Sequence, residues 1–126
     1  MDGELRKAFR EGLKAWHWQS IESALTGAGI PDSNYCVEGV EGWLELKKAD
    51  AWKVKFQTMQ PAWIMRRIRA GGRVHIAVRQ TRTDEIYLYW GGDVIALRDG
   101  SLKTVVPLGR WKRPWPWPEI GQVLLR

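Results

Sequence analysis

Two short strand-like segments, residues 34–37 and 43–47, constrain the fold more than any other part of the sequence. A glycine-containing turn separates them, and the second segment alternates between apolar and charged residues. Because successive residues of a strand point to opposite faces, Trp43, Glu45 and Lys47 share one face, and the two leucines between them occupy the other. The pair of segments therefore predicts a β-hairpin that sets an acidic and a basic side chain next to each other.

Helical patterns precede and follow this hairpin. Apolar residues recur every three to five positions over residues 5–25, which predicts one helix, or two helices separated at Gly12. A further helix is expected over residues 58–70, with Thr58 as its cap and the pair Gly71-Gly72 ending it. The hairpin is thus expected to lie between two helical segments.

Strand patterns dominate the rest of the chain. Residues 73–79, 85–90 and 94–97 are each predicted to form a strand, and a Gly-Gly-Asp turn joins the last two. The segment 106–126, rich in tryptophan and proline, is expected to follow the surface in extended form and to end in a short helix over residues 119–125. This order predicts a single domain, residues 1–126, of mixed α/β class in which helices flank a small central mixed sheet.

The composition fits a soluble domain with a polyanionic partner. The net charge of +6 over 126 residues suits binding to nucleic acid. No apolar run is long enough to span a bilayer and the first residues lack a secretory signal, so we expect a cytoplasmic protein, in the host cytoplasm if it is viral. One cysteine and two scattered histidines argue against a disulfide and a zinc site. We interpret Cys36 as a small apolar strand residue, His17 as a helix-surface residue and His75 as structural.

Acidic residues at the hairpin carry the candidate chemistry. Asp32 lies just before the first strand and Glu45 lies on the second, so pairing of the two arms brings both carboxylates to one point. Two carboxylates, with the backbone carbonyl of Leu46 as a further oxygen, are suitable ligands for a hard divalent cation. Such a cation polarises a phosphate oxygen and lowers the pKa of bound water, and Lys47 can hold that water or neutralise charge on the phosphate.

Glu22 and Gln60 are the next candidates for this site. Glu22 falls late in the predicted first helix, ten residues before Asp32, and could reach the same metal. Gln60 opens the following helix, and its amide could touch the metal-bound water or the scissile phosphate. Gln57 competes for this role, but Trp63 at the i+3 position favours Gln60.

These motifs resemble those of the PD-(D/E)XK nuclease superfamily. The resemblance is carried by Gly29-Ile30-Pro31-Asp32, Glu45-Leu46-Lys47 and Gln60-Pro61-Ala62-Trp63, and it covers residues 20–80. The chain looks most like the VRR-NUC and archaeal-type Holliday junction resolvase branches, which include small phage proteins.

The resemblance implies a restriction-endonuclease-like core and a Mg²⁺-dependent DNA endonuclease selective for branched DNA, with Mn²⁺ as a substitute metal. It implies metal binding by Asp32, Glu45 and Glu22, assistance to the attacking water by Lys47, and a supporting role for Gln60. It also implies a homodimer that presents two active sites. Because the gap between the predicted helix and Asp32 is short, we expect the usual first strand to be reduced or missing.

Other interpretations of the same residues stay open. Glu45 and Lys47 could form a weak surface pair on an edge strand, Asp32 could be an ordinary turn residue, and Glu22 could lie on a helix surface. The protein could be a non-catalytic DNA-binding module that keeps the nuclease fold, or an interaction protein that docks through its tryptophan- and proline-rich tail. Four arginines are predicted either to contact DNA phosphates or only to solubilise the protein: Arg66, Arg67, Arg69 and Arg73.

Overall fold

Helices and strands alternate along the chain in a mixed α/β order. A computed structural model describes residues 3–21 and 28–126. Its elements are α1 (Gly3–Gly12), β1 (His17–Ser20), β2 (Ser33–Val37), β3 (Val40–Ala49), α2 (Gln60–Arg69), β4 (Val74–Gln80), β5 (Glu85–Trp90), the 3₁₀ turn η2 (Gly91–Asp93), α3 (Val94–Asp99), β6 (Gly109–Trp111) and α4 (Trp117–Leu125). The mixed α/β class predicted from the sequence is confirmed.

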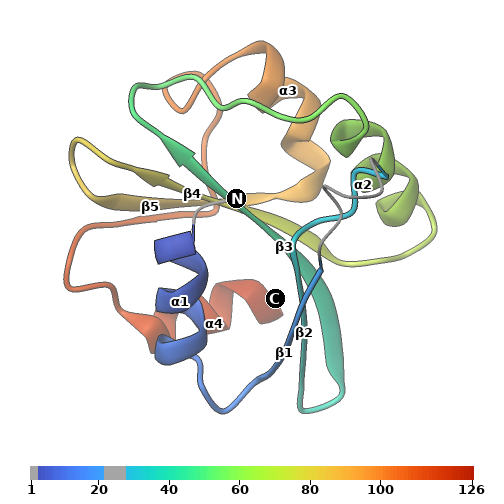
Figure 1. Ribbon diagram of the computed structural model, residues 1–126, viewed down its shortest axis with the longest axis vertical. Coiled ribbons are helices and arrows are strands. Elements are labelled where there is room, and N and C mark those ends of the chain that lie inside the picture. The colour runs from blue at the N-terminus through green and yellow to red at the C-terminus, as the bar shows by residue number, and fades with distance from the viewer. Residues whose placement is uncertain (1–2, 22–27) are drawn as a thin grey trace.

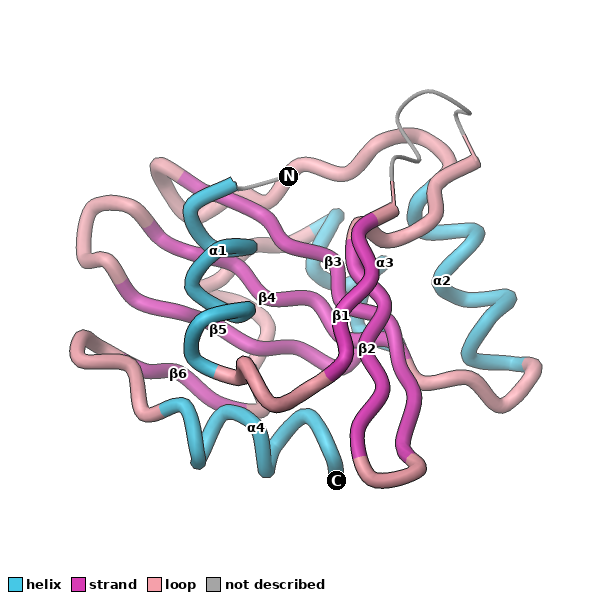
Figure 2. Tube along the Cα trace, turned by 60° about the horizontal axis from the view of Figure 1, so that its bottom comes forward, coloured by secondary structure: helices cyan, strands magenta, loops and turns pink. Residues whose placement is uncertain are grey.

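The strands of the described chain join one six-stranded sheet in the order β1-β2-β3-β4-β5-β6 (Figure 1). Neighbouring strands are antiparallel, except that β3 and β4 run parallel. A parallel pair needs a crossover connection, and α2 lies in the connection between these two strands. In Figure 2, β1 and β2 run steeply across the direction of β4 and β5, as the twist of a sheet produces.

Helices cover both faces of the sheet. Figure 1 shows α1 and α4 on one face and α2 and α3 on the other. On the first face, Phe9 of α1 and Ile120 of α4 belong to the same apolar core as Leu46 of β3. On the second face, Ile64 of α2 packs in a core with Ile76 of β4. None of the helices in the described ranges has the length and apolar character needed to traverse a lipid bilayer.

A tight turn sets the register of the β2–β3 hairpin. Both residues of Glu38-Gly39 have positive φ angles, 49° and 79°, as a type I′ turn requires. In the resulting register, Ser33 at the start of β2 pairs with Leu44 of β3. Because β3 continues beyond this pair, Glu45 and the residues after it lie past the end of β2, next to Asp32.

Helix α2 begins at Gln60, two residues after the predicted cap. Met59 occupies the N-cap position without a side-chain bond, so the prediction that Thr58 caps the helix is wrong. Pro61 lies in the first turn, where its missing N–H breaks no helical hydrogen bond. Gly71, with a φ of 96°, follows the end of the helix as predicted.

The predicted helix over residues 5–25 is wrong over residues 13–21, and its residues 22–25 lie outside the described residues. Helix α1 ends at Gly12, and the next element is strand β1, which pairs antiparallel with β2. Trp18 of β1 packs edge-on against Phe9 of α1 and against Tyr35 of β2. Tertiary contacts therefore override a spacing of apolar residues that also fits a helix. A short strand of four residues, β1, lies before the hairpin, where we expected the usual first strand to be reduced or missing.

The predicted strand over residues 94–97 is instead the start of helix α3. This helix buries Val94 and Leu97 and exposes Ile95 and Ala96 between them. Two buried positions three residues apart fit one turn of a helix, whereas a strand would bury every second residue. The β-branched residues favour a strand locally, but burial against the core decides the outcome.

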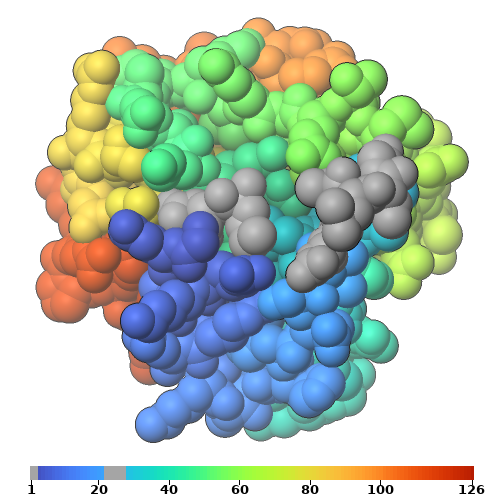
Figure 3. All heavy atoms as spheres, in the orientation of Figure 1, coloured from blue at the N-terminus to red at the C-terminus, as the bar shows by residue number. Residues whose placement is uncertain are grey.

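The tryptophan- and proline-rich segment 106–126 belongs to the core and not only to the surface. Strand β6 extends the sheet by pairing with β5, and Trp111 and Trp115 are buried. The predicted C-terminal helix is present as α4, which starts two residues earlier than expected. Figure 3 shows the segment that leads into α4 (orange-red) directly below the β4–β5 turn (yellow), where Arg113 pairs with Asp84. The expectation that the segment before α4 only follows the surface is therefore wrong at Trp111 and Trp115.

Candidate functional site

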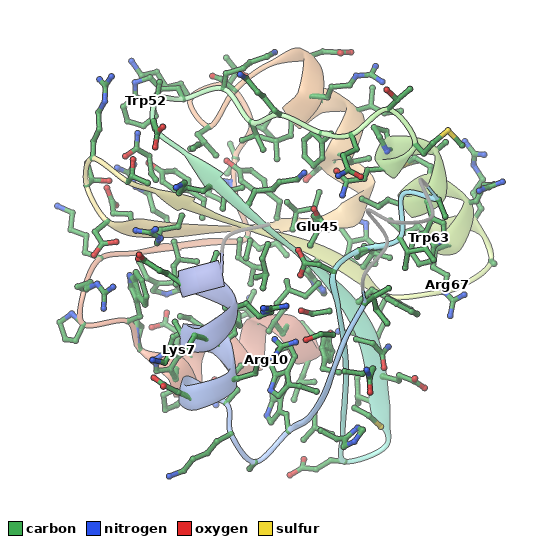
Figure 4. The ribbon with its side chains drawn as sticks, in the orientation of Figure 1. Lys7, Arg10, Glu45, Trp52, Trp63 and Arg67 are labelled. Atoms are coloured by element: carbon green, nitrogen blue, oxygen red, sulfur yellow. The ribbon has the colours of Figure 1, made fainter. Side chains whose placement is uncertain are left out.

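The side chains of Asp32 and Glu45 meet at the end of the β2–β3 hairpin. The Asp32 backbone N–H donates to Glu45 Oε1 over 3.1 Å, and the Leu46 N–H donates to Asp32 Oδ2 over 3.2 Å. Asp32 is 6 % exposed and Glu45 is 2 % exposed. Figure 4 shows Glu45 near the centre of the molecule. The hairpin register thus places two carboxylates together in a buried position.

A close backbone approach delivers Asp32 to this position. Gly29 has a φ of 77°, and a Cβ atom there would lie 2.4 Å from the carbonyl oxygen of Met59. Glycine permits both this backbone conformation and this approach. The loop before β2 consequently lies against the start of α2, and the buried Pro31 restrains the backbone next to Asp32.

Gln60 connects Lys47 to Glu45 from the first turn of α2. Its Nε2 donates to Glu45 Oε2 over 2.8 Å, and its Oε1 accepts from Lys47 Nζ over 2.8 Å. The same oxygen accepts from the Gln57 backbone N–H over 3.0 Å. Lys47 Nζ also lies 3.2 Å from Glu45 Oε2. It lies 4.9 Å from the centre of the Phe56 ring, and no pattern in the sequence predicts this second contact. Of the two candidate glutamines, Gln60 is the one whose side chain bonds to Glu45 and Lys47.

We call this set the acidic cluster: Asp32, Glu45, Lys47 and Gln60. Burial raises the pKa of Asp32, and the charge of Glu45 raises it further, to about 7, although the Leu46 N–H and the Ser33 hydroxyl act in the opposite direction. Lys47 forms its ion pair with Glu45. No basic side chain of residues 3–21 and 28–126 forms an ion pair with Asp32. The ionised form of Asp32 is therefore poorly compensated by the protein itself.

Helix α1 makes an indirect contact with the acidic cluster that sequence reasoning missed. The Ser33 hydroxyl donates to Asp32 Oδ1 over 3.1 Å, and Arg10 Nη2 donates to the Oγ atoms of Ser33 and Ser20 over 3.1 and 2.9 Å. The Arg10 guanidinium also lies 4.9 Å from the Trp18 ring centre. Arg10 thus acts on Asp32 through Ser33. The sequence does show a serine next to Asp32, which could have signalled a hydrogen bond to this carboxylate. It does not signal Arg10, which lies 23 positions before Ser33.

The oxygen atoms of the acidic cluster fit a hard divalent cation. Both carboxylates accept hydrogen bonds, but each carboxylate oxygen has two lone pairs, so acceptor capacity remains at Asp32 and Glu45. The N–H and C=O of a strand residue point toward the same neighbour, so the Leu46 carbonyl faces the side of Asp32. The described residues contain no group of three His, Cys, Asp or Glu side chains suited to a metal. Glu22, the expected further ligand, lies outside the described residues.

The arginines predicted to contact DNA fall into two groups. Three are exposed near the end of α2: Arg66, Arg67 and Arg69. Arg73 is half-buried and donates to the main-chain carbonyls of Leu124 and Arg126 at the end of α4. The first group is accessible to a phosphate backbone, whereas Arg73 holds α4 against the sheet. DNA contact stays a prediction for the three exposed arginines.

His75, His17 and Cys36 lie apart from the acidic cluster. His75 is buried, its ring meets Trp90 edge-on, and burial together with the Arg73 charge lowers its pKa to about 4. It is therefore neutral near pH 7, which fits a structural residue. His17 is exposed on β1 and not on a helix, so its expected position is wrong. Cys36 lies on a strand, as expected, but it is exposed.

Comparisons with known proteins assign no family to this arrangement. No family model matches the chain, and no curated protein matches it. The resemblance to PD-(D/E)XK nucleases accordingly stays a prediction, and the case for a function depends on the geometry and chemistry of the acidic cluster.

Proposed function

We propose that the protein is a metal-dependent DNA endonuclease that hydrolyses phosphodiester bonds and prefers branched DNA such as a four-way junction. The observation that carries the proposal is the acidic cluster, in which an amide connects a lysine to one of two buried, neighbouring carboxylates. The raised pKa of Asp32, about 7, supports it because strongly perturbed carboxylates concentrate at functional sites. The motif resemblance leads to the same activity.

A purely structural role explains the acidic cluster less well. A buried ion pair such as Lys47–Glu45 contributes little net stability, because desolvation offsets its attraction. A second buried carboxylate next to that pair adds repulsion between like charges at low dielectric constant. Asp32 is such a group, at 6 % exposure. Proteins accept a local cost of this kind chiefly where function requires it.

Asp32 and Glu45, with the Leu46 carbonyl, would hold Mg²⁺ or, as its substitute, Mn²⁺. When bound, the cation supplies Lewis-acid polarisation of the phosphate and lowers the pKa of water. Lys47 presents its ammonium group at the same point and stabilises negative charge that grows on the phosphate. Gln60 holds both Lys47 and Glu45 by hydrogen bonds, so its proposed role is to position these two side chains.

The distribution of charge supports DNA as the substrate. The chain carries a net charge of +6, and the exposed arginines of α2 lie on the helix whose first residue enters the acidic cluster. Such side chains attract a phosphate backbone irrespective of its sequence. A homodimer, which the motif resemblance implies, would present two such sites to the two strands of a junction, and we include it in the proposal.

Cleavage of a labelled four-way junction in the presence of Mg²⁺ tests this proposal. We expect the wild-type protein to cut the junction and Asp32→Ala to cut it at least about 100-fold more slowly. Asp50→Ala changes the same residue type at an exposed position and should cut at the wild-type rate, and a chelator should abolish cutting. A wild-type protein that does not cut, or that cuts no faster than Asp32→Ala, refutes the proposal.

A non-catalytic DNA-binding module is the second candidate function. It is favoured by the finding that the described residues bring only two carboxylates to the acidic cluster, without a third acidic ligand. Calorimetric titration with Mn²⁺ separates the two candidates. Metal binding that is lost in Glu45→Gln supports the nuclease, whereas junction binding without any metal binding supports the module.

A further inference from the structure

Two tryptophans and an arginine gather beside the acidic cluster. The rings of Trp43 and Trp63 meet edge to face, with centroids 5.3 Å apart and planes at 68°. The Arg67 guanidinium lies 5.3 Å from the Trp43 centroid and 5.6 Å from the Trp63 centroid. We call these three residues the Trp–Arg platform.

The Trp–Arg platform continues two rows of side chains that begin in the acidic cluster. On β3, Trp43 precedes Glu45 by two residues and shares its face, at a separation of about 7 Å along the strand. On α2, Trp63 and Arg67 follow Gln60 by three and seven positions, which places them on one stripe of the helix. Figure 4 shows Trp63 and Arg67 close together on the side of Glu45 where α2 lies. A DNA strand with one phosphate in the cluster would therefore have a neighbouring nucleotide at the platform.

The platform is fixed on its inner side and open on its outer side. Trp43 and Trp63 are half-buried and pack against the apolar core on the α2 and α3 face, whereas Arg67 is exposed. A shallow hollow of about 260 Å³ lies at this point, lined by Trp63, Arg66, Arg67 and Ala70. Rings that are already held in place, next to an exposed planar cation, are preorganised to receive a flat ligand at small entropic cost.

We propose that the Trp–Arg platform binds an unpaired nucleobase of the DNA strand whose phosphate occupies the acidic cluster. This inference rests on the proposed function and specifies its substrate as DNA with a single-stranded segment next to the cut. Unpaired bases stack on aromatic rings and on arginine planes, and such stacking contributes affinity without reading sequence. A base inside a duplex has both faces covered by its neighbours, so the platform selects against continuous duplex DNA.

Replacement of Arg67 by lysine separates stacking from simple attraction of phosphate. A guanidinium is flat and can stack on a ring or a base, whereas the lysine ammonium is a point charge without a planar face. Arg67→Lys keeps the charge, so a residue that only attracts phosphate would retain its contribution to affinity. A residue that stacks on a base would lose it. Because Arg67 is exposed, this change leaves the core intact.

A single-stranded oligonucleotide that carries 2-aminopurine tests the proposal without metal and without cleavage, because the fluorescence of this base falls when it stacks. We expect the wild-type protein to quench it and to bind the single strand more tightly than a duplex of equal length. Arg67→Lys and Trp63→Leu should each weaken single-strand binding roughly 10-fold and remove the quenching, with duplex binding nearly unchanged. The matched controls are Arg82→Lys, at an exposed loop position, and Trp52→Leu, whose ring lies 4.7 Å from Lys103 Nζ; both should behave as wild type.

Unchanged quenching in Arg67→Lys, or an equal loss of affinity for single strand and duplex, overturns the proposal, because the residue then supplies only charge. Thermal unfolding checks that Trp63→Leu is folded. If Trp63→Leu is unfolded, the result for Arg67→Lys alone decides whether the platform stacks on a base. Junction cleavage is measured separately. Quenching without any cleavage refutes the nuclease and still supports base binding, whereas cleavage without quenching overturns the Trp–Arg platform alone.

Discussion

The protein contains two pairs of carboxylates in opposite surroundings. Asp32 and Glu45 lie in the buried acidic cluster, where a lysine forms an ion pair with one of them. Asp84 and Glu85 lie at the β4–β5 turn, where three arginines form ion pairs with the two carboxylates. The same residue types therefore share one cationic partner at the first pair and three at the second.

Arginines neutralise both members of the second pair. Glu85 accepts two hydrogen bonds from Arg110, over 2.7 and 3.1 Å, and these bonds lower the pKa of Glu85. At Asp84, burial acts to raise the pKa, but the hydrogen bonds and charges of Arg113 and Arg79 outweigh it, so the net shift is downward. Folding thus favours the charged form of both carboxylates.

The difference shows where folding leaves a charge without compensation. Asp84 and Glu85 receive their counter-cations from the chain and have no need of an external ion. At Asp32, burial and the charge of Glu45 raise the pKa to about 7, so the ionised form is penalised until more positive charge arrives. A bound divalent cation is commonly the largest local charge in a site and reverses such a penalty. Metal binding is consequently expected at the first pair and not at the second.

Glu45→Gln is expected to have the largest effect, and to affect activity far more than folding. The change removes a proposed cation ligand and should slow junction cleavage by about 1000-fold. It removes both the repulsion with Asp32 and the ion pair with Lys47, two changes of opposite sign, so the free energy of unfolding should change less than the activity does. Cleavage rates and urea unfolding of one preparation check both expectations. If stability falls by more than about 3 kcal/mol together with activity, the acidic cluster is a structural element like the second pair.

Lys47→Met should have the next largest effect, a loss of about 3 kcal/mol in the free energy of unfolding at mildly alkaline pH. The variant removes the ammonium group that pairs with Glu45 and leaves the buried carboxylates without it. Added Mn²⁺ should recover part of this loss, because the metal supplies the missing positive charge. Urea unfolding with and without Mn²⁺ measures the recovery. The control is Lys48→Met, at the exposed neighbouring position, which should leave the free energy of unfolding nearly unchanged. If Mn²⁺ does not restore any of the stability lost in Lys47→Met, metal binding is contradicted.

The meeting of the carboxylates could be predicted from the sequence because its geometry is local. Asp32 immediately precedes one arm of a hairpin and Glu45 lies on the other, so strand alternation and a short turn are enough to bring them together. Gln60 could be placed near them by its position at the start of the next helix. Its hydrogen bonds to Lys47 and Glu45 could not be foreseen, because they depend on how the irregular loop after β3 returns to the sheet.

The parts that sequence reasoning missed depend on partners far away in the chain. The residues of β1 have apolar spacing that also fits a helix, and pairing with β2 decides for a strand. Val94 and Leu97 fit a strand by composition, and burial of both on one side decides for helix α3. Arg10 reaches Ser33 only because α1 packs beside the hairpin. For β1 and α3 the local pattern permits two structures and the tertiary contacts select one, and for Arg10 the tertiary contacts supply a partner that the local sequence does not show.

His75 should produce a smaller, pH-dependent effect that differs from that of either carboxylate pair. Burial lowers its pKa to about 4 in the folded protein from an ordinary value of 6.5, so the unfolded chain takes up the proton first as the pH falls. Its contribution to stability is therefore complete above pH 6.5 and is lost as the pH falls toward 4, by about 3 kcal/mol in total. Unfolding of wild type and His75→Phe across this range isolates the effect, since other groups cancel in the difference. A difference that stays constant with pH would show that His75 is not held neutral.

Glu85→Gln should have the smallest effect and the reverse signature of Glu45→Gln, although the chemical change is the same. It removes the charge and one of the two oxygens that accept from Arg110, whose side chain is 51 % exposed, so the loss of stability should be about 1 kcal/mol. This loss should shrink in high salt, which screens partly exposed pairs, and junction cleavage should be unchanged. Because the two variants remove the same charge, only the surroundings can make one lose activity and the other stability. If Glu85→Gln also impaired cleavage, the contrast between the two carboxylate pairs would not mark a reaction centre.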